Sequence, residues 1–268
     1  MLRVRVIPAL LLDDESLVKT TRFAKPRYIG DPCNTVRIFN ELEVDELAFL
    51  DITATPQRRG PNFKVLADIA SECFMPLSYG GGLSNFDMAA RVFETGFEKV
   101  VINSHAHARP GLVSEIARVY GSQAVVVGID VRRDVFGRER VVTHSGRRRQ
   151  APGPVEWARQ VEGLGAGEIL LTSVEREGTW RGFDLDLVRR VSDAVDIPVI
   201  AHGGAGSVAD LTRAVREGGA SSVAVGSMVV FQKRDYGVLV NFPERATLEA
   251  ALGTATPART KLTETAIP

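Results

Sequence analysis

The chain has 268 residues, of which 33 are basic and 33 acidic, so its formal net charge is zero. A neutral chain lacks the bulk charge that points to nucleic acid or an anionic membrane as a partner. Its apolar runs are also shorter than the ~18 to 20 residues that span a bilayer. With 44% hydrophobic residues the sequence can build a sizeable core, and its length suits one domain.

Short apolar runs of strand-like composition recur along the chain. Six of them cover 7–11, 49–53, 100–104, 126–130, 170–174 and 223–227, and two more end in the glycine clusters at 80–82 and 203–206. Continuous apolar runs are typical of parallel strands that are buried on both faces. The segments between them, such as 62–70 and 186–191, carry apolar residues at three- and four-residue spacing, which predicts outer helices.

Eight such strands and their helices predict an α/β fold, a (β/α)8 TIM barrel. We expect a single barrel over residues 1–252 with no internal domain boundary. The last residues, 253–268, lack apolar periodicity and are predicted to form a disordered C-terminal tail.

The two glycine clusters occur at matching places in the two halves of the chain. From Gly81 to Ser104 is 23 positions, and from Gly204 to Ser227 is also 23. This repetition predicts two half-barrel repeats. Glycine turns at strand ends let backbone N–H groups approach a phosphate, although glycine there is more often turn material alone. We predict two phosphate cradles, and hence an elongated ligand with a phosphate at each end; the cradles comprise Gly81, Gly82, Asn103 and Ser104, and Gly203, Gly204, Gly226 and Ser227.

Cysteine and histidine usage gives no sign of a metal centre. Cys33 and Cys73 lie 40 positions apart and form no metal-like cluster, so we expect reduced thiols in a cytoplasmic enzyme without a signal peptide. His105 and His107 have no further ligand nearby in sequence. His202 precedes the second glycine cluster, where contact with a phosphate and simple packing are both open. We expect no metal and no cofactor.

Three stretches, 45–54, 121–130 and 165–173, resemble the cyclase subunit of imidazole glycerol phosphate synthase, the HisF family. The resemblance covers about residues 1 to 252. It implies a HisH-like glutaminase partner that releases ammonia, which travels through the barrel to its mouth. There the family cleaves a bisphosphorylated ribonucleotide and closes an imidazole ring.

The resemblance also implies roles for mouth residues, with one departure. Family members use two aspartates as general acid and base. Asp130 matches the second, but the first falls on Leu11, and only Asp13 or Asp14 lie nearby. Asp130 could equally be a strand-end carboxylate that caps a turn. The remaining matches are Lys19 as a catalytic residue, and Asp51, Asn103 and Thr172 as substrate or phosphate contacts. Glu177, a further expected contact, replaces an aspartate of the family pattern and keeps its charge.

At the opposite end of the barrel the family has a charged gate for ammonia. Its matching residues here are Arg5, Glu46, Lys99 and Glu168, and Glu98 matches an acidic residue that contacts the glutaminase. The alternative is a salt-bridge cluster that simply plugs the barrel.

One branch of the family, the WbuZ-like proteins of glycosyl amidation, shares the apolar run in place of the first aspartate. It also resembles this chain at 17–20, 28–32 and 36–41. That likeness implies ammonia delivery to a separate sugar amidotransferase that forms acetamidino sugars for surface polysaccharide. Two other hypotheses stay open: the cyclase of histidine biosynthesis, and a non-catalytic scaffold that activates a glutaminase.

Overall fold

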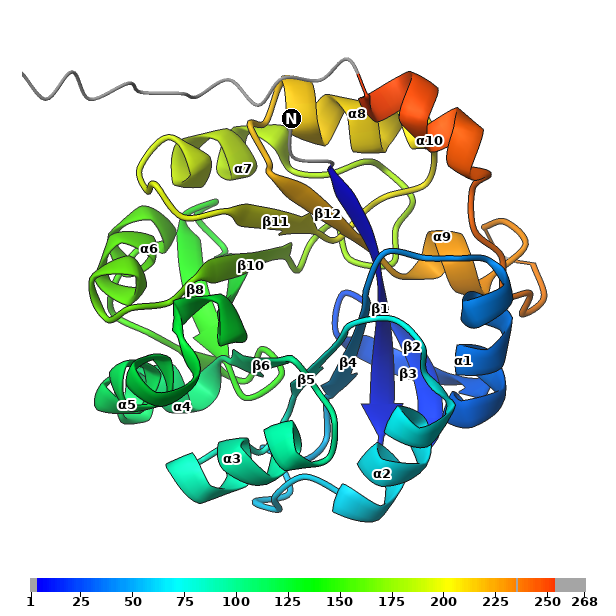
Figure 1. Cartoon of the computed structure of the whole chain (residues 1–268). Helices are drawn as coiled ribbons and strands as arrows, with labels where there is room; N and C mark the ends of the chain where they lie inside the picture. The colour runs from blue at the N-terminus through cyan, green and yellow to red at the C-terminus, as the bar shows by residue number, and fades with distance from the viewer. Residues whose placement is uncertain (1–3, 235, 254–268) are drawn as a thin grey trace, which may run out of the picture.

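The computed structural model describes residues 4–234 and 236–253, and within them the chain folds into a closed barrel (Figure 1). Its parallel strands run in chain order around the barrel, and the circle closes where the last strand pairs with the first. The barrel strands are β1 (Arg5–Asp13), β4 (Leu47–Asp51), β5 (Leu77–Gly80), β6 (Lys99–Ile102), β7 (Val125–Arg133), β10 (Glu168–Ser173), β11 (Val199–His202) and β12 (Ser222–Val225).

Helices connect successive strands and form the outer layer of the barrel (Figure 1). Several begin at polar caps, such as Asp31 and Asn85, whose side chains accept from backbone N–H groups of the first turn. The helices are α1 (Pro32–Glu41), α2 (Phe63–Glu72), α3 (Phe86–Glu94), α4 (Ser104–Ala108), α5 (Gly111–Tyr120), α6 (Pro154–Gly163), α7 (Leu185–Ser192), α8 (Val208–Arg216), α9 (Ser227–Val230) and α10 (Arg245–Leu252), with a 3-10 turn, η1, at Ser122–Ala124.

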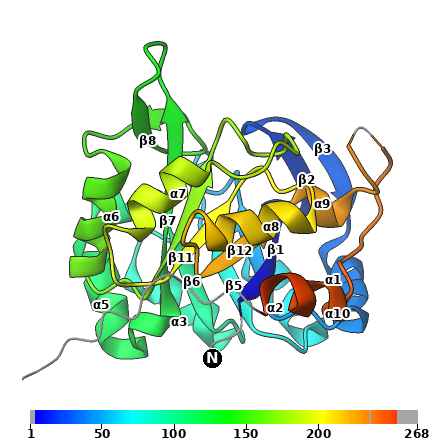
Figure 2. The ribbon, with the colours of Figure 1, turned by 90° about the horizontal axis from the view of Figure 1, so that it is seen from above.

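Antiparallel extensions rise from two of the barrel strands. The strand β1 continues into β2 (Ser16–Thr21) and β3 (Ala24–Gly30), and β7 continues into β8 (Glu139–Thr143) and β9 (Arg148–Arg149). Figure 2 shows both extensions on the end of the barrel that lies away from the N-terminus. Because they follow the carboxyl ends of β1 and β7, they surround the end where such barrels bind ligands.

Apolar packing occurs in two separate places. A large cluster fills the space between the strands and the outer helices. A smaller cluster fills the barrel interior, and small or branched side chains dominate it: Ile7, Ala9, Ala48, Val101, Val126, Leu170, Ile200 and Ala224. The interior cluster is thus made of apolar side chains, and polar side chains lie at the carboxyl ends of the strands.

The predicted (β/α)8 barrel is confirmed, while its division into two half-barrel repeats stays a prediction. In the described part of the chain, no helix is both long and apolar enough to cross a membrane. The last described helix ends at Leu252, and the domain boundary expected there stays a prediction. Residues 254–268 of the expected tail lie outside the described residues.

Candidate active site at the barrel mouth

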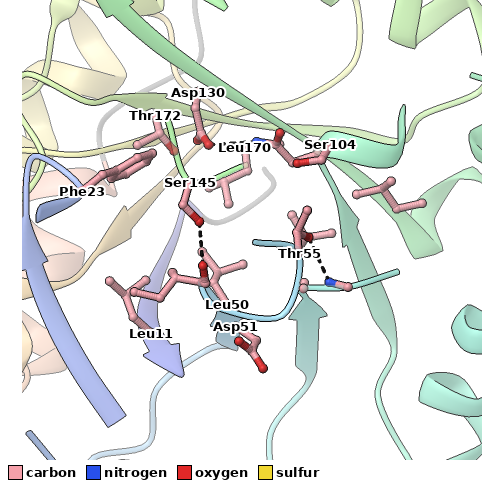
Figure 3. A pocket seen from close by; sticks show the side chains of 18 of the residues that line it. Leu11, Phe23, Leu50, Asp51, Thr55, Ser104, Asp130, Ser145, Leu170 and Thr172 are labelled. Carbon is pink, nitrogen blue, oxygen red and sulfur yellow. Dashed lines mark hydrogen bonds between the residues drawn. The ribbon is translucent and has the colours of Figure 1, made fainter. Parts of the chain in front are cut away.

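A cavity of about 140 Å³ opens at the carboxyl ends of the barrel strands (Figure 3). Seven different barrel strands and the loops that follow them contribute its walls. Its polar lining includes the predicted residues Asp51, Asn103, Ser104, Asp130, Thr172 and Glu177, together with glycines 80, 81 and 82. The barrel therefore brings side chains from distant parts of the sequence to one site.

Asp130 is the cavity carboxylate best suited to move a proton. It lies on β7 next to Thr172 of β10, and the Asn103 amide donates to its Oδ2 over 2.9 Å. Burial raises the pKa of Asp130 to about 7, against the opposing hydrogen bonds from Thr172 and Asn103. A carboxyl group with that pKa can both donate and accept a proton near neutrality.

Leu11 presents an apolar side chain where the family resemblance places the first of the two catalytic aspartates. It lines the cavity and is 6% exposed. Figure 3 shows Leu11 and Leu50 on the side of the cavity opposite Asp130 and Thr172. Leucine has no titratable group, so Leu11 contributes an apolar surface to the cavity and cannot transfer a proton.

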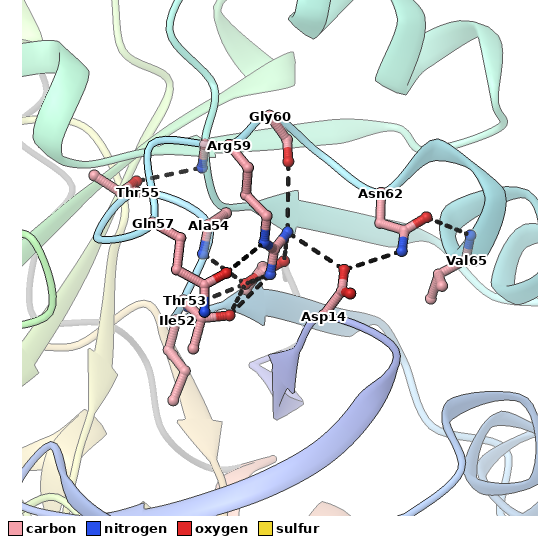
Figure 4. A network of polar contacts seen from close by, with 12 residues as sticks. Asp14, Ile52, Thr53, Ala54, Thr55, Gln57, Arg59, Gly60, Asn62 and Val65 are labelled. Carbon is pink, nitrogen blue, oxygen red and sulfur yellow. Dashed lines mark hydrogen bonds and ion pairs between the residues drawn. The ribbon is translucent and has the colours of Figure 1, made fainter.

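Neither nearby aspartate replaces it. Asp13 pairs with Ser16 at the turn between β1 and β2, outside the cavity lining. The Asp14 carboxylate accepts from the Asn62 amide over 3.0 Å and lies 3.6 Å from the Arg59 guanidinium (Figure 4). Both carboxylates therefore belong to the rim of the barrel, and the hypothesis that one of them reaches back to the cavity finds no support in these contacts.

Lys19 forms a buried ion pair with Glu177 across the mouth. The same carboxylate accepts from the Thr20 hydroxyl over 3.2 Å and from the backbone N–H of Phe23 over 3.3 Å. Glu177 thus ties the β2–β3 extension to the loop after β10. Lys19 is held by this pair beside the second glycine cluster, where a side chain at Gly226 would collide with it.

The first glycine cradle opens directly into the cavity. Gly82 has a φ of 66°, and a side chain there would collide with the Arg59 carbonyl, so backbone geometry alone already requires glycine. The Oδ1 atom of Asn103 is buried and has no hydrogen-bond partner among the described residues. A donor group on a ligand in the cavity would satisfy it.

Asp51, predicted as a substrate contact, has its carboxylate largely engaged within the protein. Its Oδ2 lies 2.8 Å from Arg59 Nη1, and its Oδ1 accepts from the backbone N–H groups of Thr53 and Ala54. These bonds shape the loop between β4 and α2, which Figure 4 shows around the Arg59 side chain. Asp51 still lines the cavity, so contact with a ligand stays a prediction.

The second glycine cradle is much smaller, with a volume of about 10 Å³. Its walls are Lys19, Glu177, His202, Gly203, Gly204, Gly226 and Ser227, with Gly178, Ala205 and Ala224. The two cradles, which the sequence presents as equivalent, therefore differ in this structure, and the Lys19–Glu177 pair forms part of the wall of the second.

A closed ring of four charges occupies the opposite end of the barrel. Arg5 lies 2.6 Å from Glu46 and 3.0 Å from Glu168, and Lys99 lies 3.1 Å from each of the two glutamates. Each cation thus contacts both anions. We call these four residues the charged ring. The apolar interior of the barrel separates it from the mouth cavity.

Comparison with known proteins identifies the family of the chain. The family model described as histidine biosynthesis protein matches residues 5–235. A Pseudomonas aeruginosa protein, provisionally named imidazole glycerol phosphate synthase subunit hisF2, is 46% identical over 244 residues, 91% of this chain and 97% of its own. The chain belongs to the HisF family of histidine biosynthesis proteins.

Two further relatives cover almost their whole length. A Leptospira borgpetersenii protein is 41% identical over 251 residues, 93% of this chain and 99% of its own. A Vibrio vulnificus protein is 40% identical over 253 residues, 94% of this chain and 97% of its own. Their provisional names are imidazole glycerol phosphate synthase subunits HisF and hisF3.

Outside the mouth, Glu98 lies exposed beside the charged ring of this HisF-family barrel, where its Oε2 accepts from the backbone N–H of Leu77 over 2.6 Å. No group of three or more potential metal ligands occurs in the described part of the chain.

Sequence reasoning missed several residues of the HisF-family mouth. Thr20 and Phe23 bind Glu177, Arg59 binds Asp51, and the Thr55 hydroxyl accepts from the backbone N–H of Gly82 over 3.3 Å. Thr20 borders Lys19 in sequence and could have been noticed there. Arg59 and Thr55 carry no local signal, because their roles depend on how the loop after β4 folds back.

Proposed function

We propose that this chain is the ammonia-accepting synthase subunit of a glutamine-dependent amidotransferase and works with a separate HisH-like glutaminase. The observation that carries the proposal is the pairing of two ends: the charged ring at one end of an apolar barrel interior and a cavity with a titratable carboxyl group at the other. Ammonia is small and neutral, so a ring of mutually neutralised charges can open for it without moving a net charge.

At the mouth, the residues bind and position a phosphorylated ligand. Backbone N–H groups near Gly81 and Gly82, with Asn103 and Ser104, offer an anion a first cradle, and Gly204 and Ser227 offer a second. Asp130, with its pKa near neutrality, takes a proton from the attacking amine nitrogen or returns one to it.

The missing carboxylate at Leu11 favours ammonia transfer without ring closure. That is the pattern expected of a subunit that supplies nitrogen to a separate sugar amidotransferase, with an acetamidino sugar for surface polysaccharide as the product. The cytoplasm is the compartment that we propose for this chemistry.

A specific observation favours a second candidate, the cyclase of histidine biosynthesis. Three relatives that match this chain over nearly their whole length carry that subunit's provisional name, and Asp130 and the glycine cradles are in place. The names support this candidate more directly than they support amidation. A non-catalytic scaffold that activates its glutaminase is the third possibility.

The experiment uses the barrel with its co-expressed glutaminase, glutamine labelled with ¹⁵N in its amide, and the bisphosphorylated ribonucleotide. Labelled imidazole glycerol phosphate would establish the cyclase. Labelled ammonia that reaches the mouth without ring closure, trapped there by an added electrophile such as an activated ester, would support ammonia delivery. Glutaminase activation without any release at the mouth would leave the scaffold.

A further inference from the structure

His202 lies at the junction of the two cavities of the mouth. It ends β11, is 6% exposed, and lines both the main cavity and the second cradle, a position that it shares with Glu177. Its Nδ1 lies 3.1 Å from the Thr172 hydroxyl, in register with it on the neighbouring strand. The imidazole ring is therefore held in place, and it is next to any ligand in the second cradle.

The charges around His202 come from several elements. The Lys19 ammonium of β2 and the Glu177 carboxylate of the loop after β10 line the same cradle, and Asp130 of β7 lies beyond Thr172. Burial, and to a smaller extent the Lys19 charge, lower the pKa of His202 to about 4, although the Glu177 charge opposes this. Without a ligand the imidazole is thus neutral at pH 7.

The second cradle is short of positive charge for an anion. Among the described residues that line it, Lys19 is a cation, and Glu177 already neutralises it. A phosphate dianion in the cradle would face the Glu177 carboxylate with no net positive charge to balance it. One more proton in the cradle would reduce this repulsion, and His202 is the neutral base in the lining that can accept it while the Lys19–Glu177 ion pair stays intact.

We propose that His202 is a specificity-determining residue of the second cradle that takes up a proton from solvent when an oxyanion, such as a phosphate group, binds there. The inference rests on the phosphorylated ligand of the proposed function. An opposite charge within about 4 to 6 Å raises a base's pKa by about 1 to 3 units. Binding at this cradle is then tighter at pH 6 than at pH 8.

The test follows the ring signals of the four histidines by NMR between pH 4 and 8, with and without sulfate. Sulfate is a suitable probe because it stays a dianion over this range. Bound sulfate should raise the pKa of His202 by about three units, the upper end of the range for an opposite charge, because only a shift of that size makes binding at pH 6 about ten-fold tighter. His144, which lies outside the linings of both cavities, should keep its pKa.

Calorimetry on matched variants separates the outcomes. His202→Asn should weaken sulfate binding at the second cradle about ten-fold at pH 6 and remove the part of the pH dependence that His202 contributes, while the control His144→Asn should change neither. Binding that shifts the backbone amide of Ser227 but leaves the pKa of His202 unmoved would overturn the inference and keep the phosphate site. Binding that shifts the Ser104 amide alone would also overturn it. An absence of any anion binding would overturn both the inference and the phosphate-binding part of the proposed function.

Discussion

Lys19 and Glu177, which are 158 positions apart in the sequence, form a buried ion pair that joins the two halves of the barrel mouth. Glu177 is 1% exposed and Lys19 is 6% exposed, so water screens neither charge well. The pair also holds the β2–β3 extension over the site, because Thr20 and Phe23 bind the same carboxylate.

Glu177→Gln should destabilise the fold, because it leaves the Lys19 charge buried without its partner. Breaking such a pair costs about 3 to 5 kcal/mol in free energy of unfolding. Urea unfolding would measure it. The control is Glu217→Gln, which breaks an exposed pair with Arg213 in α8 and should cause no resolvable change. Equal effects from the two substitutions would contradict a buried, weakly screened pair.

Asp130 should make stability depend on pH. Its pKa is raised to about 7 in the folded chain, above the ordinary value of 3.8, so the fold favours the protonated form. The contribution of Asp130 to the free energy of unfolding is fully present below about pH 4. It is lost as the pH rises towards 7, by at most about 1.4 kcal/mol per pH unit.

The comparison of parent and Asp130→Asn by urea unfolding at several pH values isolates that contribution. The parent's free energy of unfolding should fall relative to the variant's between about pH 4 and 7 and then level off above 8. Histidines whose pKa values burial lowers, such as His202, titrate alike in both proteins and cancel. A difference that rises with pH would mean that Asp130 is held ionised.

The sequence carries the barrel itself in local signals. Continuous apolar runs predict the parallel strands, and the structure confirms them at β4, β6 and β10. The charged ring was reached through family resemblance: Arg5, Glu46, Lys99 and Glu168 are far apart in sequence, and only closure of the barrel brings their side chains together.

The parts that the sequence did not predict depend on side-chain contacts between distant loops. Two glycine clusters at equal spacing suggest two cradles of equal size. In the structure Lys19 and Glu177 line the second cradle, which has a volume of only about 10 Å³. Likewise, Asp51 resembles a free substrate contact until Arg59 folds back onto it. The spacing of the sequence does not reveal that Glu177 pairs with Lys19 or that Arg59 pairs with Asp51. Glu177 and Arg59 lie on irregular loops, and tertiary packing decides the course of those loops.

Ring closure should be slow in the parent protein and recover in Leu11→Asp. Proton transfer by a placed acid or base contributes about 100-fold or more, so we expect a rate at least ~100-fold below that of a family cyclase when ammonium salts and the bisphosphorylated ribonucleotide are supplied. The substitution adds a carboxyl group across the cavity from Asp130. The formation of imidazole glycerol phosphate measures the rate. Leu11→Asn is the control, because it adds a polar side chain that has no titratable proton. A parent rate within ten-fold of a cyclase would refute this prediction.

Two working cradles should bind a bisphosphate more tightly than either matching monophosphate, as calorimetry can measure. Ser104→Asp and Ser227→Asp place a negative charge at one cradle each and should each weaken the bisphosphate at least ten-fold. Serine positions are better probes than Gly82 or Gly204, where a side chain would collide with the backbone. Equal affinities for mono- and bisphosphate would mean that only one cradle binds phosphate and that the glycines of the other serve only to form a turn.

The charged ring allows conduction and simple plugging to be told apart. If ammonia passes through it, Lys99→Trp should block the route in the complex with glutaminase, and the glutamine-driven rate should fall at least ten-fold. Added ammonium salts supply ammonia directly at the mouth, so that rate should stay nearly unchanged. A structural cluster predicts that both rates fall together, since breaking part of a buried charge network can cost about 3 to 5 kcal/mol of stability.

The decisive quantity is the ratio of the glutamine-driven rate to the ammonium-driven rate, measured at matched folded concentration in the parent and Lys99→Trp. Lys99→Met serves as the control, because it removes the charge from the ring but adds little bulk and should obstruct the route far less. A ratio that falls in the tryptophan variant and holds in the methionine variant supports a channel at the charged ring. A ratio unchanged in both would reject conduction there, because the substitution stands beside both Glu46 and Glu168 and no ammonia could pass the ring without meeting it.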